Sequence, residues 1–204
     1  MGRLKPEVQS FVEQVKAELH SHGFRLCFGR GKTVNGGGWR AVGYFCDRRR
    51  EIRVARARSD WLDILIHEYA HFRQWVEQPA RVYNADARAS TVVDGYLHRK
   101  RKVAPGLLRK AFARVMAFER DAEMRAVAIA KAKGLPVDPD NYIRHANLYI
   151  YSHHLMRDTG KWKADRSPHQ SWKIVRSMPT DFKVQPHRSI PRPVYALLAR
   201  CYDR

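Results

Sequence analysis

Residues 61–78 read WLDILIHEYAHFRQWVEQ and combine apolar and polar side chains in a regular pattern. The apolar side chains of this stretch recur three or four positions apart, which predicts an amphipathic helix that buries one face. These side chains are Leu62, Ile66, Tyr69, Ala70 and Trp75. Asp60 stands directly before the stretch, where an aspartate can cap the first turn of a helix.

The segments upstream predict another helix and a small sheet. Residues 5–22 carry apolar side chains at helical spacing, between Pro6 at the start and Gly23 at the end. Three short segments of strand character follow, separated by a glycine-rich stretch and a charged turn. They are residues 24–28, 39–46 and 51–57. We expect them to form a small antiparallel sheet.

The downstream part is expected to be helical, with its segments ended by glycine, proline and polar residues. The predicted helices cover residues 85–97, 107–133, 141–157 and a short apolar segment, VYALLARC, at 194–201. We therefore expect a mainly α-helical α+β domain over residues 1–157. A basic C-terminal extension over residues 158–204 would pack on it or trail from it.

The composition favours a protein that attracts polyanions and argues against a membrane-spanning or secreted one. The 204 residues include 39 Lys+Arg and 20 Asp+Glu, a formal net charge of +19, which attracts polyanions. No run approaches the ~18 apolar residues of a membrane span, and the N-terminus lacks the apolar centre of a signal peptide. Cys27, Cys46 and Cys201 form no CxxC pair and suit small buried thiols. We expect an intracellular, cytoplasmic protein that is not inserted in a membrane.

The sequence HEYAH inside residues 61–78 predicts a metal site. His67 and His71 are four residues apart on one helical face, so both imidazoles can reach one zinc ion. Glu68 would lie beside the open coordination position and take a proton from a metal-bound water. The alternative is a surface histidine pair with a solvated glutamate.

A catalytic zinc site needs a third protein ligand. No histidine follows within ten residues of His71, which excludes the metzincin pattern. The best candidates lie in AFERDAEMRAVA, where Glu119 and Glu123 share a helical face with small alanines. We expect Glu119 to be the third ligand and Glu123 to hold a zinc-bound histidine, whereas Asp121 points elsewhere. An ordinary charged helix face is the alternative.

HEYAH followed by ERDAE resembles the gluzincin arrangement of zincin metallopeptidases, HExxH with a downstream acidic motif. The resemblance implies a zincin-like fold, Zn2+ as cofactor and the same roles for Glu119 and Glu123, although Glu123 stands where aspartate is usual. The order of hairpin and LIHEYAH is also partly similar to SprT-like protease domains, which act on proteins crosslinked to DNA. Their histidine third ligand and cysteine zinc ribbon have no counterpart here. The implied function is zinc-dependent hydrolysis of peptide bonds through a metal-bound water activated by Glu68.

Two features concern the substrate. In a zincin-like fold, residues 51–57 would form the sheet edge above the cleft, where an extended peptide can add as a strand. Arg53, Arg56 and Arg58 would then place positive charge beside the substrate, unless they form only a solvated edge. Protein or peptide substrates held on nucleic acid would suit that charge.

Candidates for stabilising the transition state lie in NYIRHANLYIYSHHLM. Tyr149 and His153 are the main ones, and the sequence does not separate them from the others of this segment. The others are His145, Tyr151 and His154.

Basic tracts provide candidates for binding a polyanion such as nucleic acid. The first set is Arg48, Arg49, Arg50, Arg99, Lys100, Arg101 and Lys102. Further lysines and arginines lie near tryptophans: Lys161 and Lys163 beside Trp162, and Lys173 and Arg176 beside Trp172.

The alternative function is a basic nucleic-acid-binding or assembly protein with a structural or inactive metal site. General solubility charge would also account for the basic tracts. Two histidines and a glutamate accept cobalt or manganese as well as zinc, so the ligand types leave the metal open. The sequence leaves the oligomeric state open too.

Overall fold

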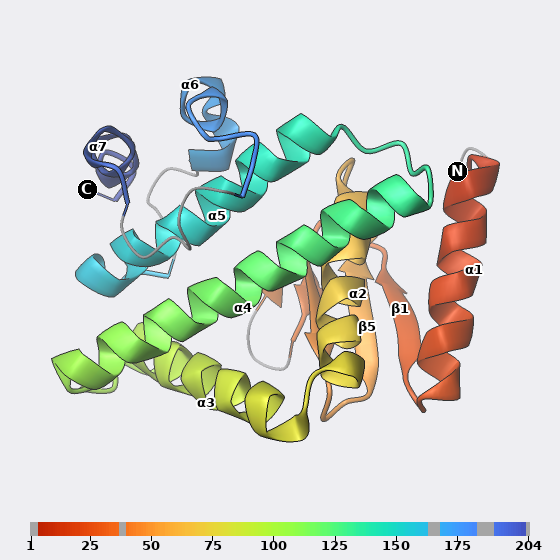
Figure 1. The fold of residues 1–204 in the computed structure, drawn as a ribbon, viewed down its shortest axis with the longest axis horizontal. Helices are drawn as coiled ribbons and strands as arrows, with labels where there is room; N and C mark the ends of the chain where they lie inside the picture. The colour runs from red at the N-terminus through yellow and green to blue at the C-terminus, as the bar shows by residue number, and fades with distance from the viewer. Residues whose placement is uncertain (1–3, 37–39, 163–167, 183–189, 203–204) are drawn as a thin grey trace. The chain divides into compact units, whose positions relative to one another are not determined.

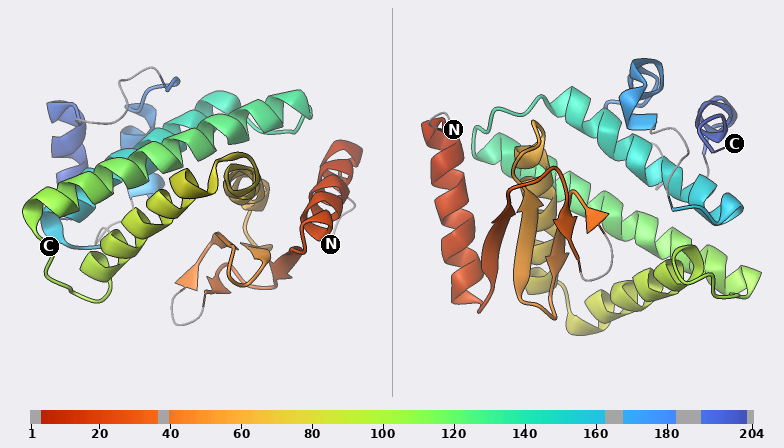
Figure 2. Two further views of the ribbon diagram at one scale, coloured as in Figure 1. Left: turned by 60° about the horizontal axis from the view of Figure 1, so that its bottom comes forward. Right: turned by 180° about the vertical axis from the view of Figure 1, so that it is seen from behind.

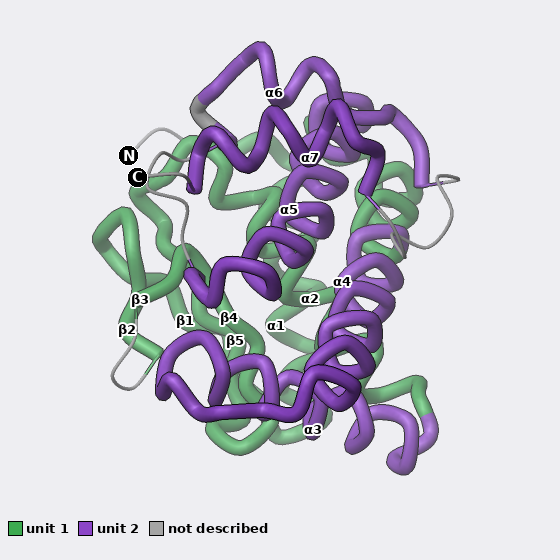
Figure 3. Tube along the Cα trace, turned by 90° about the vertical axis from the view of Figure 1, so that its left-hand side faces the viewer, with its two compact units in different colours: residues 1–78, 125–137 green, residues 79–124, 138–204 purple. Residues whose placement is uncertain are grey.

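The computed structural model describes residues 4–36, 40–162, 168–182 and 190–202. The chain divides into two compact units, distinguished in Figure 3: unit 1 comprises residues 1–78 and 125–137, and unit 2 comprises residues 79–124 and 138–204. In unit 1 the short strands follow one another between helices α1 and α2, and unit 2 is helical. The predicted α+β class with mainly helical content is confirmed.

Among its described residues, unit 1 contains helices α1 and α2, five strands and the end of helix α4 (Figure 1). Their bounds are α1 Pro6–Ser21, β1 Arg25–Gly29, β2 Val34–Asn35, β3 Arg40–Ala41, β4 Gly43–Cys46, β5 Glu51–Ala55, α2 Trp61–Glu77 and α4 Pro105–Ala132. Residues 37–39, including the predicted strand start at Trp39, lie outside the described residues.

The larger sheet has the strand order β1-β5-β4, and β2 pairs with β3 in a second sheet. β4 and β5 are antiparallel, as are β2 and β3, whereas β1 and β5 are parallel, so the sheet is mixed rather than wholly antiparallel. The reason is that the chain forms three other strands between β1 and β5 before it returns.

β5 is the central strand, so the prediction that residues 51–57 form the sheet edge is wrong. Ile52 and Val54 are fully buried on one face of β5. On the other face the carboxylate of Glu51, only 2% exposed, accepts hydrogen bonds from neighbouring strands. The charged residues that alternate with apolar ones in this segment are therefore paired within the sheet and do not form a solvated edge.

Helix α2 covers one face of the larger sheet, and Figure 2 (right) shows the sheet from the opposite side with α2 behind it. Leu65, Ile66 and Phe72 are fully buried on α2, as its apolar spacing predicts. Asp60 directly precedes α2, but its side chain does not form the predicted cap hydrogen bond. Its carboxylate pairs with Arg58 instead, at 2.6 and 2.7 Å.

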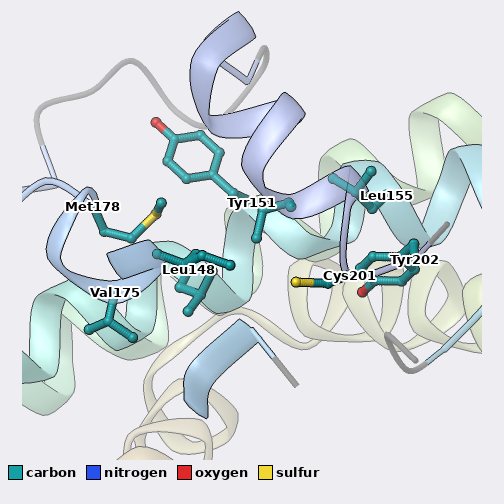
Figure 4. Packing of buried hydrophobic residues seen from close by; sticks show 9 residues of the cluster. Leu148, Tyr151, Leu155, Val175, Met178, Cys201 and Tyr202 are labelled. Atoms are coloured by element: carbon teal, nitrogen blue, oxygen red, sulfur yellow. The ribbon is translucent and has the colours of Figure 1, made fainter. Parts of the chain in front are cut away.

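Unit 2 comprises α3, most of α4, α5 and shorter C-terminal helices. Their bounds are α3 Ala80–Leu97, α5 Pro139–Thr159, the short η1 Pro168–Gln170, α6 Trp172–Arg176 and α7 Arg192–Ala199. One apolar cluster joins α3, α4 and α5 around Phe112. A second joins α5, α6 and α7 around Leu148, Tyr151 and Leu155 (Figure 4).

Helices α3, α4, α5 and α7 match the predicted segments to within a few residues, except that α3 begins at Ala80 rather than Ala85. No helix was predicted where η1 and α6 lie. The predicted boundary after residue 157 falls near the end of α5, and the division of the chain there stays a prediction. All three cysteines are free thiols, with Cys201 buried and the other two partly exposed. Among the helices that the structure describes, none combines the length and apolarity needed to cross a bilayer.

Candidate metal centre

His67 and His71 project together from α2. Their rings meet edge to face with centroids 4.6 Å apart, and their Nε2 atoms are 3.2 Å apart. Two nitrogens each about 2.1 Å from a tetrahedral zinc ion would be separated by about 3.4 Å. The two imidazoles therefore have the spacing of a shared metal site, which fits the predicted role of this pair.

The orientation of His71 is fixed by Gln74, which the sequence analysis missed. The Oε1 of Gln74 lies 2.8 Å from Nδ1 of His71, and the Gln74 side chain is fully buried one turn further along α2. With the amide oxygen accepting, Nδ1 carries the proton, and Nε2 keeps the lone pair that a metal requires. In the sequence, Gln74 does not differ from the other polar positions of this helix, so its role depends on the burial that the structure shows.

Glu68 lies between the two histidines in sequence and is buried against the sheet. A Cβ added to Gly43 on β4 would lie 3.3 Å from Cγ of Glu68 and 2.4 Å from Cγ2 of Ile64. Only glycine allows β4 to come this close to α2. Gly43 therefore helps to position the stem of Glu68, and the sequence pattern gave no hint of this.

The outer face of the sheet carries a charge network around Glu51. Its carboxylate accepts hydrogen bonds from Tyr44 at 2.7 Å and from Arg25 at 3.0 Å, and Arg53 lies 3.3 Å away. Burial pushes the pKa of Glu51 upward, but these donors and the charge of Arg53 outweigh it, so the pKa is lower than usual. Arg53 is therefore paired with Glu51 within the sheet.

The other candidate arginines of this region also have partners. Arg58 pairs with Asp60, and the guanidinium of Arg56 lies 3.4 Å from the centre of the Trp61 ring. Arg49 donates to the hydroxyl of Tyr44 at 3.5 Å. Arg56 and Arg58 are thus fixed at the start of α2.

Arg48, Arg49 and Arg50 of the first basic tract are all exposed. The guanidinium of Arg50 lies 4.7 Å from the centre of the Phe24 ring and 5.4 Å from that of Trp75. Arg50 also adopts a positive φ of 54°. Its cation–π contacts give it a structural role in unit 1.

In unit 2, α4 carries the acidic candidates. Glu119 shares one helical stripe with Ala122, Glu123 and Ala126, and both alanines are fully buried. The carboxylate of Glu123 is buried and accepts a hydrogen bond from the hydroxyl of Tyr142 at 2.6 Å. The predicted role of Glu123 toward a histidine stays a prediction.

Glu119 has an electrostatic partner in His153 of α5. Burial lowers the pKa of His153, and the negative charge of Glu119 opposes this effect. The Nδ1 of His153 lies 3.1 Å from the backbone oxygen of Tyr149, to which an Nδ1–H would donate. A neutral His153 in this tautomer offers only an acceptor at Nε2.

The other candidates on α5 lie in different surroundings. Tyr151 belongs to the apolar cluster between α5, α6 and α7 (Figure 4), where burial raises its pKa. The ring of His145 stacks on that of His169, with centroids 5.6 Å apart. His154 is buried. The negative charge of Glu119 thus influences the titration of His153, one of the five candidates on this helix.

The second basic tract, 98–102, forms the turn after α3, and Arg99, Lys100, Arg101 and Lys102 are all exposed there. Lys163 lies outside the described residues. Comparison of the chain with protein-family models, curated proteins and solved structures gave no match. The site therefore has to be interpreted from its own residues.

Proposed function

We propose that the protein is a zinc-dependent metallopeptidase whose zinc ion is held by His67, His71 and Glu119. The observation that carries the proposal is the 3.2 Å separation of the two Nε2 atoms, with Nδ1 of His71 held by the buried Gln74. Surface histidines without a ligand do not require a buried partner that fixes one tautomer.

The choice of Glu119 rests on the continuity of α4. The last part of this helix belongs to unit 1, where Arg125 pairs with Glu77 of α2. Glu119 precedes Arg125 by six residues, which is about 9 Å along a helix axis. Glu119 also lies on the same face of α4 as the fully buried Ala126. A carboxylate on this stripe suits the third ligand of a His, His, Glu site.

When bound, zinc would supply a Lewis acid that polarises the scissile carbonyl and makes water more acidic. Glu68 would accept the proton of the attacking water and return it to the leaving amine. Its burial beside β4 keeps the carboxylate in one place and limits access of bulk water. Tyr149 and His153 stay the candidates for donating to the developing oxyanion. An Nδ1–H of His153 would donate to the backbone oxygen of Tyr149, which would leave Nε2 for this role.

A peptide substrate is favoured by the position of β4. This strand lies at the edge of the larger sheet, and its Gly43 adjoins Glu68. An extended peptide could pair with such an edge and bring its backbone carbonyl toward Glu68. The edge that would receive the substrate is β4 rather than the predicted residues 51–57.

The proposal is tested by replacing Glu68 with glutamine in the full chain. Glu68→Gln should retain zinc and the unaltered unfolding midpoint, and should lose cleavage of an unstructured protein such as casein by about 100-fold or more. Equal cleavage by both proteins would refute the role of Glu68. Zinc binding with no cleavage by the unaltered chain would instead favour the alternative, a structural metal site in a basic binding protein.

A further inference from the structure

Two segments of unit 2 that are about 60 residues apart in sequence come together at the end of α3. The Nζ of Lys100 donates to the backbone oxygen of Gly160 at 3.0 Å, and the rings of His98 and Trp162 have centroids 4.9 Å apart. The hydroxyl of Tyr96 also donates to the backbone oxygen of Arg157 at 2.9 Å. These contacts define a surface, the turn patch, made of His98, Arg99, Lys100, Arg101, Lys102, Lys161 and Trp162.

The turn patch is shaped by the way α3 ends. Lys100 adopts a left-handed conformation with φ 51°, and the backbone N–H of Arg101 then donates to the oxygen of Gly95 at 2.9 Å. A Cβ at Gly95 would lie 3.1 Å from Cδ of Arg101, so the aliphatic part of this arginine lies over the glycine. The basic residues are thus held on a folded turn against α3, rather than on an extended tail.

Positive charge exceeds negative charge in this region. The patch contains five Lys and Arg side chains. Among the residues that the structure describes, the acids with a partner beside the patch are Asp94 and Asp158. Asp94 lies 3.6 Å from Arg99, and Asp158 pairs with Arg157 at 2.8 Å. Lys100, Arg101 and Lys102 are exposed beside them. Such a surface attracts the phosphates of a nucleic acid.

An aromatic side chain lies within this positive charge. Trp162 is 36% exposed and rests against His98, so part of its indole faces solvent next to the basic turn. We infer that the turn patch binds single-stranded nucleic acid, with a base stacked on Trp162 and neighbouring phosphates contacted by the lysines and arginines. Single strands are favoured over duplexes because a base can stack on the indole only when it is not paired within a helix. The inference goes beyond the proposed peptidase activity and does not depend on it.

The test is the binding of a fluorescein-labelled 20-nucleotide oligo(dT) to the full chain, followed by anisotropy between 0.05 and 0.3 M salt, about the range in which phosphate contacts dominate. Arg99→Gln/Lys102→Gln should weaken binding by about 25-fold at 0.1 M salt and reduce the log–log salt slope by about 1.4, since each lost phosphate contact contributes about 0.7. Trp162→Leu should weaken binding by about fivefold or more and leave the slope unchanged.

The matched control is Lys131→Gln/Lys133→Gln, which removes the same charge from the exposed end of α4. It should bind as the unaltered chain does, apart from a small effect of net charge. The inference is overturned if the control and Arg99→Gln/Lys102→Gln lose equal affinity, or if the unaltered chain does not bind. It is also overturned if duplex DNA binds equally well and Trp162→Leu has no effect, because the patch would then act through charge alone.

Discussion

Replacing Gln74 with leucine tests how the metal ligand His71 is positioned. Leucine keeps the buried volume of Gln74 but removes the oxygen that lies 2.8 Å from Nδ1 of His71. Removing the partner of a metal-binding histidine weakens metal affinity by about 10–100-fold. This corresponds to about 1.4–2.7 kcal/mol of binding free energy. Without metal, the unpaired Nδ1–H should also lower the free energy of unfolding by about 1–3 kcal/mol.

The assay is competition for Zn2+ with a chromophoric chelator, combined with urea unfolding in the presence of EDTA. Gln74→Glu is the matched control, because its carboxylate can still accept from Nδ1–H, and its zinc affinity should equal or exceed that of the unaltered chain. Zinc binding by Gln74→Leu as tight as that of the unaltered protein would refute this role of Gln74. An equal loss of zinc affinity with leucine and with glutamate would also refute it, since the effect would then be one of packing.

Three other substitutions test the surroundings of the site. Gly43→Ala places a methyl group 2.4 Å from Ile64 and should lower the free energy of unfolding in urea by about 1–3 kcal/mol; an unchanged midpoint would show that β4 can move away. The pKa of Glu51 is lower in the folded state, so its contribution is present above the unfolded pKa near 4.5 and is lost as pH falls through the folded pKa. Glu51→Gln should therefore flatten the fall in stability between neutral and acidic pH, and parallel pH profiles would contradict this. Tyr142→Phe removes the hydrogen bond to Glu123 and should cost about 1.5–3 kcal/mol in urea unfolding, whereas a loss below about 0.5 kcal/mol would mean that the carboxylate has another donor.

The helices and the histidine pair could be predicted from the sequence because both depend on local spacing. A period of three to four residues defines α2, and the same period brings His67 and His71 onto one face. The buried alanines at 122 and 126 on α4 also follow from helical spacing. In each case the relevant neighbours lie within two turns of one another.

The sheet could not be predicted to the same extent. The position of β5 between β1 and β4 depends on pairing between distant segments, whereas the expected edge position follows from a zincin-like fold. Glu51 is buried only because Arg25, Arg53 and Tyr44 come from three strands to meet it. A local sequence pattern does not identify partners that lie on distant strands.

Two functional residues were missed for a related reason. Gln74 looks like an ordinary polar position of an amphipathic helix until its burial against His71 is known. Gly43 looks like a flexible strand residue, yet its missing side chain allows β4 to lie against Glu68. The turn patch likewise depends on contact between residues 98–100 and 160–162, which no local pattern contains.

The most direct test of the proposed function is the metal content of the purified full chain, measured by plasma mass spectrometry beside His71→Ala and Glu119→Ala. We expect about one zinc ion per unaltered chain and almost none in either variant, because a three-ligand site loses most of its metal affinity when one ligand is removed. Circular dichroism of each variant would check that it is folded. Absence of metal from protein never exposed to chelator, or full zinc occupancy in folded Glu119→Ala, would contradict the proposed His67, His71 and Glu119 site.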